Sequence, residues 1–399
     1  MRKFVTFGIA AAVTAAALTG CSTGSDSSDP IKVAVIATSS GPLAKFGADT
    51  LTAIQYAADE RNAAGGVNGR PIELTVVETD GTPARSVAAV RKAVTQDGAR
   101  FITGVLSSPE QIAIQPILTN LGAISMAYVS DDVLHQHMCS PNAFLMSQSA
   151  TMSIKATVNA LTPEQLSGKW AFTSVDVSSG HVAAQLMREA VEKAGGSVVS
   201  DEVSPMGTTD FGPQISKLKD SGADQLFIAQ YGADGVAFVN QASQYKLFDQ
   251  MKSVVGSNLI AEPLFPALGD KIVGFYNDVR YSPLIDTPKN TDFVDKWRAK
   301  ESADLYYLTG GNYMAMQVLF AGLEKAGSAE PDAVRTALSG MEVDTLYGPA
   351  KIRPEDHQLL LPTYVGQVEK DSTGALQFKL IDTVDADRTT PTPSPECKL

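Results

Sequence analysis

Short apolar runs alternate with amphipathic stretches along most of the chain, and this alternation restricts the fold more than any other feature of the sequence. Residues 31–37 (IKVAVIA) are typical of a buried strand. Leu51, Ile54 and Ala58 recur at helical spacing within residues 48–63, which predicts a helix after that strand. A strand and a helix that repeat in this order indicate a parallel sheet with helices on both faces.

The alternation runs in two successive sets, so we expect an α/β protein of two lobes, each a doubly wound parallel sheet. The first set predicts strands at residues 31–37, 73–78, 101–104 and 123–129, and helices at 48–63, 84–96 and 109–120. The second set predicts strands at 170–175, 197–203, 225–230 and 253–256, and helices at 182–193, 211–220 and 235–245. Further helices are expected at 291–300, 311–325 and 332–338, and a hairpin at 364–369 and 375–382.

The N-terminus predicts export and a lipid anchor. A short basic start is followed by an alanine-rich apolar run from residue 4 to about 18, which is too short for a transmembrane helix and is typical of a secretory signal. Residues 18–21 (LTGC) match a bacterial lipobox, in which Cys21 becomes the lipidated first residue. The alternative is an ordinary signal peptide with a chance cysteine. Residues 22–30 are rich in Ser and Gly, as a flexible tether would be.

Charge and motif content exclude several function classes. The formal net charge is −12 with no basic block, so we expect no nucleic-acid partner, because phosphates are bound by Lys and Arg. The chain contains no G-x-S-x-G, phosphate-loop, H-E-x-x-H or dinucleotide fingerprint, and we expect neither a cofactor nor enzymatic activity. No segment after the signal could span a bilayer.

We expect the ligand site at the carboxyl ends of the predicted strands, because open α/β sheets bind ligands there. If the two lobes face each other through these ends, the cleft between them would hold a small molecule. The loops concerned are residues 39–47, 80–83, 106–109, 126–132, 176–180, 231–234 and 257–262.

Four segments resemble the leucine/isoleucine/valine-binding protein family of ABC transporters. They are residues 41–47 (GPLAKFG), 62–70 (NAAGGVNGR), 104–108 (GVLSS) and 209–211 (TDF), and the match runs from residue 31 to about 382. The resemblance implies a type I periplasmic-binding fold, with two lobes, three crossover strands and a hinge that closes on the ligand. It also implies that the ligand is bound without being chemically changed.

The domain boundaries complete the prediction. The N-terminal pattern predicts a signal peptide at residues 1–20 and a lipidated tether at 21–30, and composition predicts a Pro/Thr-rich tail at 386–399 that we expect to be extended. Lobe 1 is expected to comprise residues 31–146 and 283–352, and lobe 2 residues 147–282 and 353–385.

The resemblance also implies a set of ligand-binding residues. In the first lobe the family's ligand serine corresponds to Ser108, with Ser107 beside it, and its carboxylate contacts correspond to Ala127 and Val129, with Tyr128 between them. The ligand-facing aromatic residues correspond to Phe46 and Tyr231. A second-lobe aromatic position is Ser179 here, and the acid that pairs with a ligand ammonium corresponds to Asn258. These two substitutions, with Val129, depart from the amino-acid pattern, so the ligand is either an ordinary aliphatic amino acid or another small carboxylate or amide.

Other clusters have simpler interpretations. His135 and His137 alternate on an expected loop, and we expect a solvated loop rather than a metal site. Asp131 and Asp132 could contact a ligand or calcium, but an acidic pair is usually a loop end or a helix start. The tyrosines Tyr306, Tyr307 and Tyr313 are expected in the core or on a lobe surface.

The remaining two cysteines, Cys139 and Cys397, are expected to form a disulfide, since both would be exported to an oxidising compartment. In one branch of the family a similar Cys-Ser-Pro follows the fourth strand and a similar cysteine lies near the C-terminus.

Three functions remain open. In import, the lobes close on a small solute and the closed form docks on the permease of an ABC transporter with its ATPase subunits. In sensing, a signalling receptor detects the same closure. Enzymatic activity is the third option. We expect import by a monomer that is lipid-anchored on the extracytoplasmic face of the cell membrane.

Overall fold

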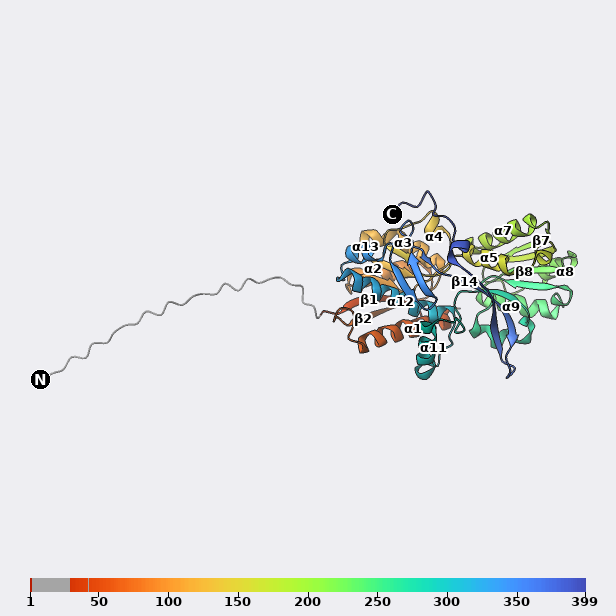
Figure 1. Cartoon of the computed structure of the whole chain (residues 1–399). Coiled ribbons are helices and arrows are strands. Elements are labelled where there is room, and N and C mark those ends of the chain that lie inside the picture. Colours follow the sequence, from red (N-terminus) through yellow and green to blue (C-terminus); the bar gives the residue numbers. More distant parts are fainter. Residues whose placement is uncertain (2–28, 42) are drawn as a thin grey trace.

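The computed structural model describes Met1, residues 29–41 and residues 43–399. The predicted signal peptide, Cys21 and most of the tether therefore lie outside the described residues. Two lobes lie side by side, each built on its own sheet (Figure 1). None of the helices in the described residues has the length and apolar character that a bilayer crossing requires.

Lobe 1 is built on a parallel sheet of five strands in the order β2-β1-β3-β4-β5. Successive residues of β1 face opposite sides: Val33 and Val35 pack against α1 and α12, whereas Ala34 and Ile36 pack against α2 and α3. The sheet is therefore buried on both faces, as a parallel sheet must be. The strands are β1 (Ile31–Thr38), β2 (Ile72–Thr79), β3 (Phe101–Thr103), β4 (Ile124–Ala127) and β5 (Ala143–Leu145). The helices are α1 (Ala44–Ala63), α2 (Pro83–Thr95), α3 (Ser108–Leu121), α4 (Val133–Gln136), α11 (Pro288–Lys300), α12 (Tyr307–Ala326) and α13 (Pro331–Leu338).

Lobe 2 is built on seven strands in the order β15-β14-β10-β9-β8-β6-β7. The antiparallel pairing of β14 with β15 confirms the hairpin predicted around residues 371–374. The strands are β6 (Lys169–Val175), β7 (Ser197–Ser204), β8 (Gln225–Ala229), β9 (Ser253–Gly256), β10 (Tyr276–Val279), β14 (Thr363–Lys370) and β15 (Leu376–Val384). The helices are α5 (Ala150–Ala160), α6 (Pro163–Leu166), α7 (Ser178–Lys193), α8 (Gly212–Asp220), α9 (Gly232–Gln244), α10 (Phe265–Leu268) and α14 (Ala386–Thr389), with 3-10 turns η1 (Phe248–Gln250), η2 (Glu262–Leu264) and η3 (Gly269–Ile272).

A small third sheet, with the order β11-β12-β13, lies against lobe 1. Its strands are β11 (Glu342–Thr345), β12 (Gly348–Ile352) and β13 (Leu359–Leu360). Because β13 still pairs with β12 and Gln358 pairs with Leu145 of β5, residues 353–360 lie with lobe 1. The chain therefore enters lobe 2 after Leu360, later than the boundary expected at residue 352.

The chain crosses between the lobes after β5, after β10 and after β13. One side chain joins the three crossings: the buried amide of Gln148 donates to the carbonyl of Arg280, at 3.2 Å, and to that of Pro362, at 2.8 Å. The side chain at the first crossing thus holds the backbone carbonyls of the other two close together.

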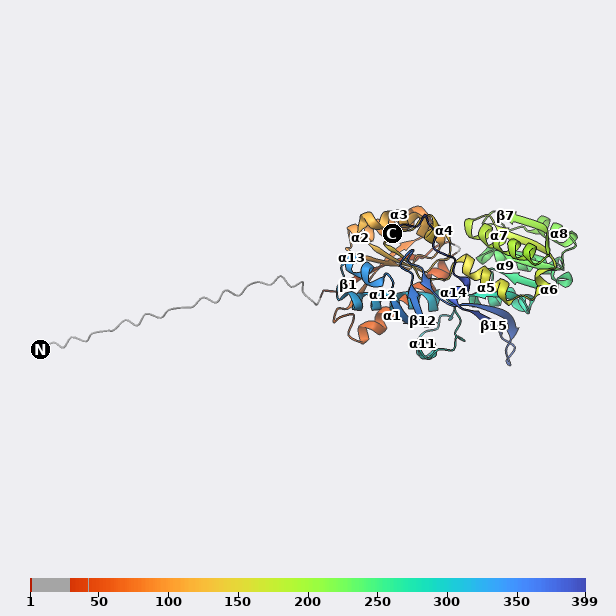
Figure 2. The same ribbon diagram turned by 45° about the horizontal axis from the view of Figure 1, so that its top comes forward.

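The C-terminal segment makes a fourth connection. Helix α14, which interrupts the tail expected to be extended, packs against α5 in lobe 2 (Figure 2). The chain then returns to lobe 1, where Arg353 donates to the carbonyl of Pro391 at 2.6 Å. The predicted bridge between Cys139 and Cys397 is present and fixes the tail to lobe 1.

A buried histidine beside the first crossing predicts a pH effect on stability. His357 stacks on Phe144 at 4.1 Å, and burial lowers its pKa to about 4. In the unfolded chain the imidazole of His357 is protonated at its ordinary pKa of about 6.5. The stability that comes from the unprotonated, buried His357 is therefore complete above pH 6.5 and is lost as the pH falls towards 4. We expect a loss of about 3 kcal/mol in the free energy of unfolding over this interval.

The matched control is His357→Asn, because Asn tolerates the left-handed φ of +57° at this position and does not titrate. Denaturant titrations at pH 7 and pH 4 measure both proteins. Equal losses in the two would show that His357 does not cause the effect.

Candidate ligand-binding cleft

A small cavity lies between the lobes, where the strand ends of lobe 2 meet the loop after β4. Its volume of about 20 Å³ accommodates roughly one water. Hydroxyl groups and two opposite charges dominate its lining. The lining residues are Ser130, Ala150, Ser153, Ser179, Tyr231, Ser257, Asn258, Asp278 and Arg280.

Three residues predicted from sequence line this cavity: Ser179, Tyr231 and Asn258. Ser179 is in the first turn of α7, and Tyr231 directly precedes α9. Burial raises the pKa of Tyr231 to about 12, with a smaller opposing effect from a hydrogen bond with Ser179. The phenol is therefore a neutral hydrogen-bonding group at physiological pH.

The six predicted residues of lobe 1 do not line the cavity. Phe46 packs against Tyr306 with ring centroids 6.2 Å apart, and Ala127 and Val129 are buried with Leu134. The remaining three are Tyr128, Ser107 and Ser108, which have different roles.

Tyr128 faces the interior of lobe 1. A Cβ added at Gly311 of α12 would lie 2.1 Å from its ring, so the ring occupies the space that this glycine leaves open. The ring therefore cannot point into the cleft.

Ser107 and Ser108 begin α3 but differ in their hydrogen bonds. The hydroxyl of Ser107 donates to the fully buried Glu110 at 2.8 Å, and Glu110 also accepts from Ser86 at 2.7 Å. This capping box orients the first turn of the helix. Ser108 lies in that turn and is partly exposed.

Two residues that sequence reasoning missed, Asp278 and Arg280, add charge to the cavity. They lie two positions apart where β10 ends, so both side chains face the same way along the strand. Asn258 connects them: its backbone N–H donates to Asp278 at 2.6 Å, and its side-chain oxygen accepts from the guanidinium of Arg280. The four-residue β10, YNDV, lacks a clear apolar pattern, and so its end was not among the expected loops.

The acidic pair before α4 serves mainly to hold the lobes and the local backbone. Asp132 accepts from the backbone of Thr151 at 2.9 Å, and Asp131 accepts from Ser178 of lobe 2 at 3.4 Å. Burial raises the pKa of Asp131, and the hydrogen bond that its carboxylate accepts from the backbone N–H of Val133 opposes this.

The histidines of the predicted loop have separate partners. His135 is buried with Nε2 3.4 Å from Asp132, and His137 is exposed and lies 2.7 Å from Glu396. Within the residues that the structure describes, no group of three His, Cys, Asp or Glu side chains is arranged to hold a metal.

The expected tyrosines divide by role. Tyr306 donates to the buried Asp49 at 3.1 Å, and Tyr313 donates to Glu60 at 2.6 Å, both within lobe 1. Tyr307 instead lies under the guanidinium of Arg280, 4.3 Å from ring centroid to Cζ. It therefore supports the cavity from outside its lining.

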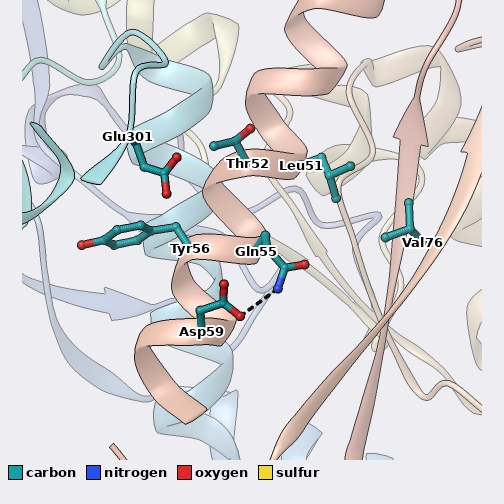
Figure 3. Close-up of a pocket in the computed structure, with 7 residues that line it drawn as sticks. All are labelled: Leu51, Thr52, Gln55, Tyr56, Asp59, Val76 and Glu301. Atoms are coloured by element: carbon teal, nitrogen blue, oxygen red, sulfur yellow. Dashed lines mark hydrogen bonds between the residues drawn. The ribbon is translucent and has the colours of Figure 1, made fainter. Parts of the chain in front are cut away.

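A larger hollow of about 300 Å³ lies on the outer side of lobe 1, beside α1 and the edge strand β2 (Figure 3). Tyr56 and Gln55 line it, and the amide of Gln55 donates to Asp59 at 2.9 Å. Lobe 2 contributes no lining residue to this hollow, so lobe closure cannot enclose a ligand there. The interlobe cavity is the better candidate despite its smaller volume.

Comparison with known families gives one match across most of the chain. The model of the periplasmic binding protein family matches residues 30–374. Leu/Ile/Val-binding protein homolog 6 of Brucella melitensis is 27% identical over 390 residues, which cover 94% of this chain and 96% of the relative. Leu/Ile/Val-binding protein BraC3 of Rhizobium johnstonii is 27% identical and covers 80% of this chain and 86% of the relative.

Solved structures give the same result. A solute-binding protein of an ABC transporter from R. palustris, in complex with 4-hydroxybenzoate, has a TM-score of 0.80 and 26% identity, covering 90% of this chain and 97% of that chain. The leucine-, isoleucine-, valine-, threonine- and alanine-binding protein of Brucella ovis, in its closed conformation, has a TM-score of 0.80 and 20% identity, covering 92% and 98%. The similarity to the Brucella ovis protein, at 20% identity, shows the fold alone.

Proposed function

The chain belongs to the periplasmic binding protein family and has its type I fold, and from this premise we propose that it captures a small organic solute for an ABC importer. The observation that carries the proposal is the interlobe cavity, because both lobes and the crossings between them contribute to its lining. A ligand held there touches both lobes only when they are closed. Binding and closure are therefore coupled.

The solute that we propose is an amino acid or another small carboxylate or amide. The relatives support this range: two are named for leucine, isoleucine and valine, and a solved relative holds 4-hydroxybenzoate. The many hydroxyl groups of the cavity suit a polar ligand of this size.

Closure requires the ligand to bind the closed form better than the open form. A shift from a mostly open to a mostly closed population takes about 5 kcal/mol of differential affinity. Contacts with Tyr231 and Asn258 of lobe 2, added to those of lobe 1, are the source of this difference. The lining residues hold the ligand and leave it unchanged, so the protein is not an enzyme.

The proposal includes a cellular location and a partner. Cys21 would carry lipid and hold the protein on the extracytoplasmic side of the membrane, and the closed monomer would dock on the permease, whose ATPase subunits supply the energy. Mass spectrometry of the mature N-terminus tests the anchor, and an unmodified chain that starts at another residue would contradict it.

The function is tested by calorimetry and thermal shift of the purified domain against amino acids, amides, and aliphatic and aromatic carboxylates. We expect at least one class to bind and to raise the melting temperature, because a ligand that binds only the folded state stabilises it. If no solute binds while the protein remains folded, the proposal is wrong.

Ser108→Ala should weaken binding of the solute found in that screen. The substitution removes one hydrogen bond to a polar ligand group, which corresponds to about 1–3 kcal/mol of binding free energy. Ser107→Ala is the matched control, since its hydroxyl is already bonded to Glu110, and it should lower stability more than affinity. Calorimetry and thermal melts of both variants separate the two effects. Unchanged affinity in Ser108→Ala would remove this serine from the site.

A further inference from the structure

We propose that Arg280 binds an acidic group of the ligand, so that the cleft selects carboxylates over their neutral amides. The inference rests on the proposed function, because it concerns the same cavity. Arg280 belongs to the second crossing, and its side chain lines the cavity together with Asn258 of lobe 2.

The first argument is the burial of a charge without an ionic partner. Arg280 is only 7% exposed, yet within the part of the chain that the structure describes no carboxylate oxygen forms an ion pair with it within 4.0 Å. Its nearest acid, Asp278, is also buried and accepts a hydrogen bond from the backbone of Asn258 instead. Asp278 lines the same cavity as the opposite charge, but it does not occupy the donors of the guanidinium, so these donors can meet an anion that arrives with the ligand.

The second argument is that the guanidinium is held in one orientation. Its face lies over the ring of Tyr307 at 4.3 Å, and one edge donates to the side-chain oxygen of Asn258. A guanidinium has five N–H groups in a rigid plane, so donors remain after these contacts. A carboxylate can accept two parallel hydrogen bonds from such an edge.

A purely structural role does not account for the side chain. The backbone carbonyl of Arg280 does serve the crossings, because Gln148 donates to it at 3.2 Å and Tyr347 at 2.6 Å. Any residue would provide that carbonyl. The side chain contacts Tyr307 and Asn258, and its remaining donors are available to a ligand in the cavity.

Asp278 determines what else the ligand can carry. Its carboxylate lies on the same side of the strand as Arg280 and lines the same cavity, so an amine near the acidic group would meet a negative charge. An α-amino acid and an amine-free acid both satisfy Arg280. They differ in their dependence on Asp278.

The test uses matched probes that differ in one group: leucine, leucinamide and 4-methylpentanoate, with 4-hydroxybenzoate and 4-hydroxybenzamide as an aromatic pair. Calorimetry on the wild-type protein should show that an acid binds at least about 10-fold more tightly than its amide. In Arg280→Gln the acid should lose roughly 10- to 100-fold in affinity, because a charged hydrogen bond is lost, while the amide changes little.

Two further variants keep the test interpretable. Arg280→Lys retains the charge but lacks the two parallel donors of a guanidinium, so it should lose an intermediate amount of affinity for the acid. This variant tests the inference if Arg280→Gln does not fold. Asp278→Asn should reduce binding of leucine relative to 4-methylpentanoate and leave binding of the amine-free acid nearly unchanged.

The outcomes distinguish this inference from the proposed function. If the wild type binds an acid and Arg280→Gln binds it equally well, Arg280 is not the anchor, although the protein remains a solute-binding protein. Preference of the wild type for amides over acids also overturns the inference alone. Failure of the folded wild type to bind any solute would overturn both.

Discussion

Gln148→Glu should lower the free energy of unfolding by about 3–5 kcal/mol, which is a large part of the stability of an ordinary domain. The amide of Gln148 is fully buried and donates to the carbonyls of Arg280 and Pro362. A carboxylate has no donor, so the substitution would place a buried negative charge against two acceptor oxygens. The three crossings would separate, and ligand binding should be lost with the fold around them. Denaturant titration measures the loss.

Gln230→Glu is the matched control in the core of lobe 2. Gln230 is equally buried and donates to the hydroxyls of Thr173 and Ser204, both at 2.9 Å. Hydroxyl groups can rotate and donate to a carboxylate, whereas carbonyls cannot. The loss of stability at Gln230 should therefore be clearly smaller. Equal losses at both positions would mean that the effect at Gln148 comes from burial of charge alone and not from the joined crossings.

Removal of the disulfide should have an effect of similar size. Replacing Cys139 and Cys397 by Ser opens a loop with a sequence separation of 258, and the chain-entropy model gives a loss of up to about 5–6 kcal/mol. Contacts of the tail, such as that between Arg353 and the carbonyl of Pro391, persist in the folded state and do not replace the covalent restraint on the unfolded chain.

The measurement is a denaturant titration of the double variant beside the wild type with and without reductant. Reduced wild type and double variant should unfold at the same, lower midpoint. Thiol labelling of the denatured, unreduced wild type should detect neither Cys139 nor Cys397. An unchanged midpoint after confirmed reduction would contradict the predicted contribution.

The alternation of strands and helices was sufficient to predict both sheets, because each unit is local and its apolar pattern repeats at a fixed period. The elements that were missed had weak local signals. Helix α5, with sequence ATMSIKATVNA, carries five Ser or β-branched residues that lower helix propensity, although Ser149 caps it by accepting from Met152 at 3.3 Å. Strand β5 has only three residues. Packing against the second sheet and the crossings determines that α5 and β5 form.

The candidate site was only partly predictable for a related reason. Ser179, Tyr231 and Asn258 were implied by the family resemblance, and they lie just after strands that were clearly predicted. Arg280 was missed because β10 was missed. Tyr128 was included because it lies between Ala127 and Val129, whereas its ring occupies the space beside Gly311. That glycine is remote in sequence, and no local pattern shows that it leaves room for this ring.

The bridge also determines how the domain would bear mechanical load. Cys139 and Cys397 enclose all of lobe 2 and the crossings, so a pulling force applied between residue 29 and the end of the tail passes through the sulfur–sulfur bond and bypasses everything enclosed. Only the segment before Cys139 can extend under that load. At about 3.6 Å per residue, breaking the bridge would release a further length on the order of 900 Å. A protein held by its N-terminus would thus keep the segment between Cys139 and Cys397, which includes all of lobe 2, shielded from tension.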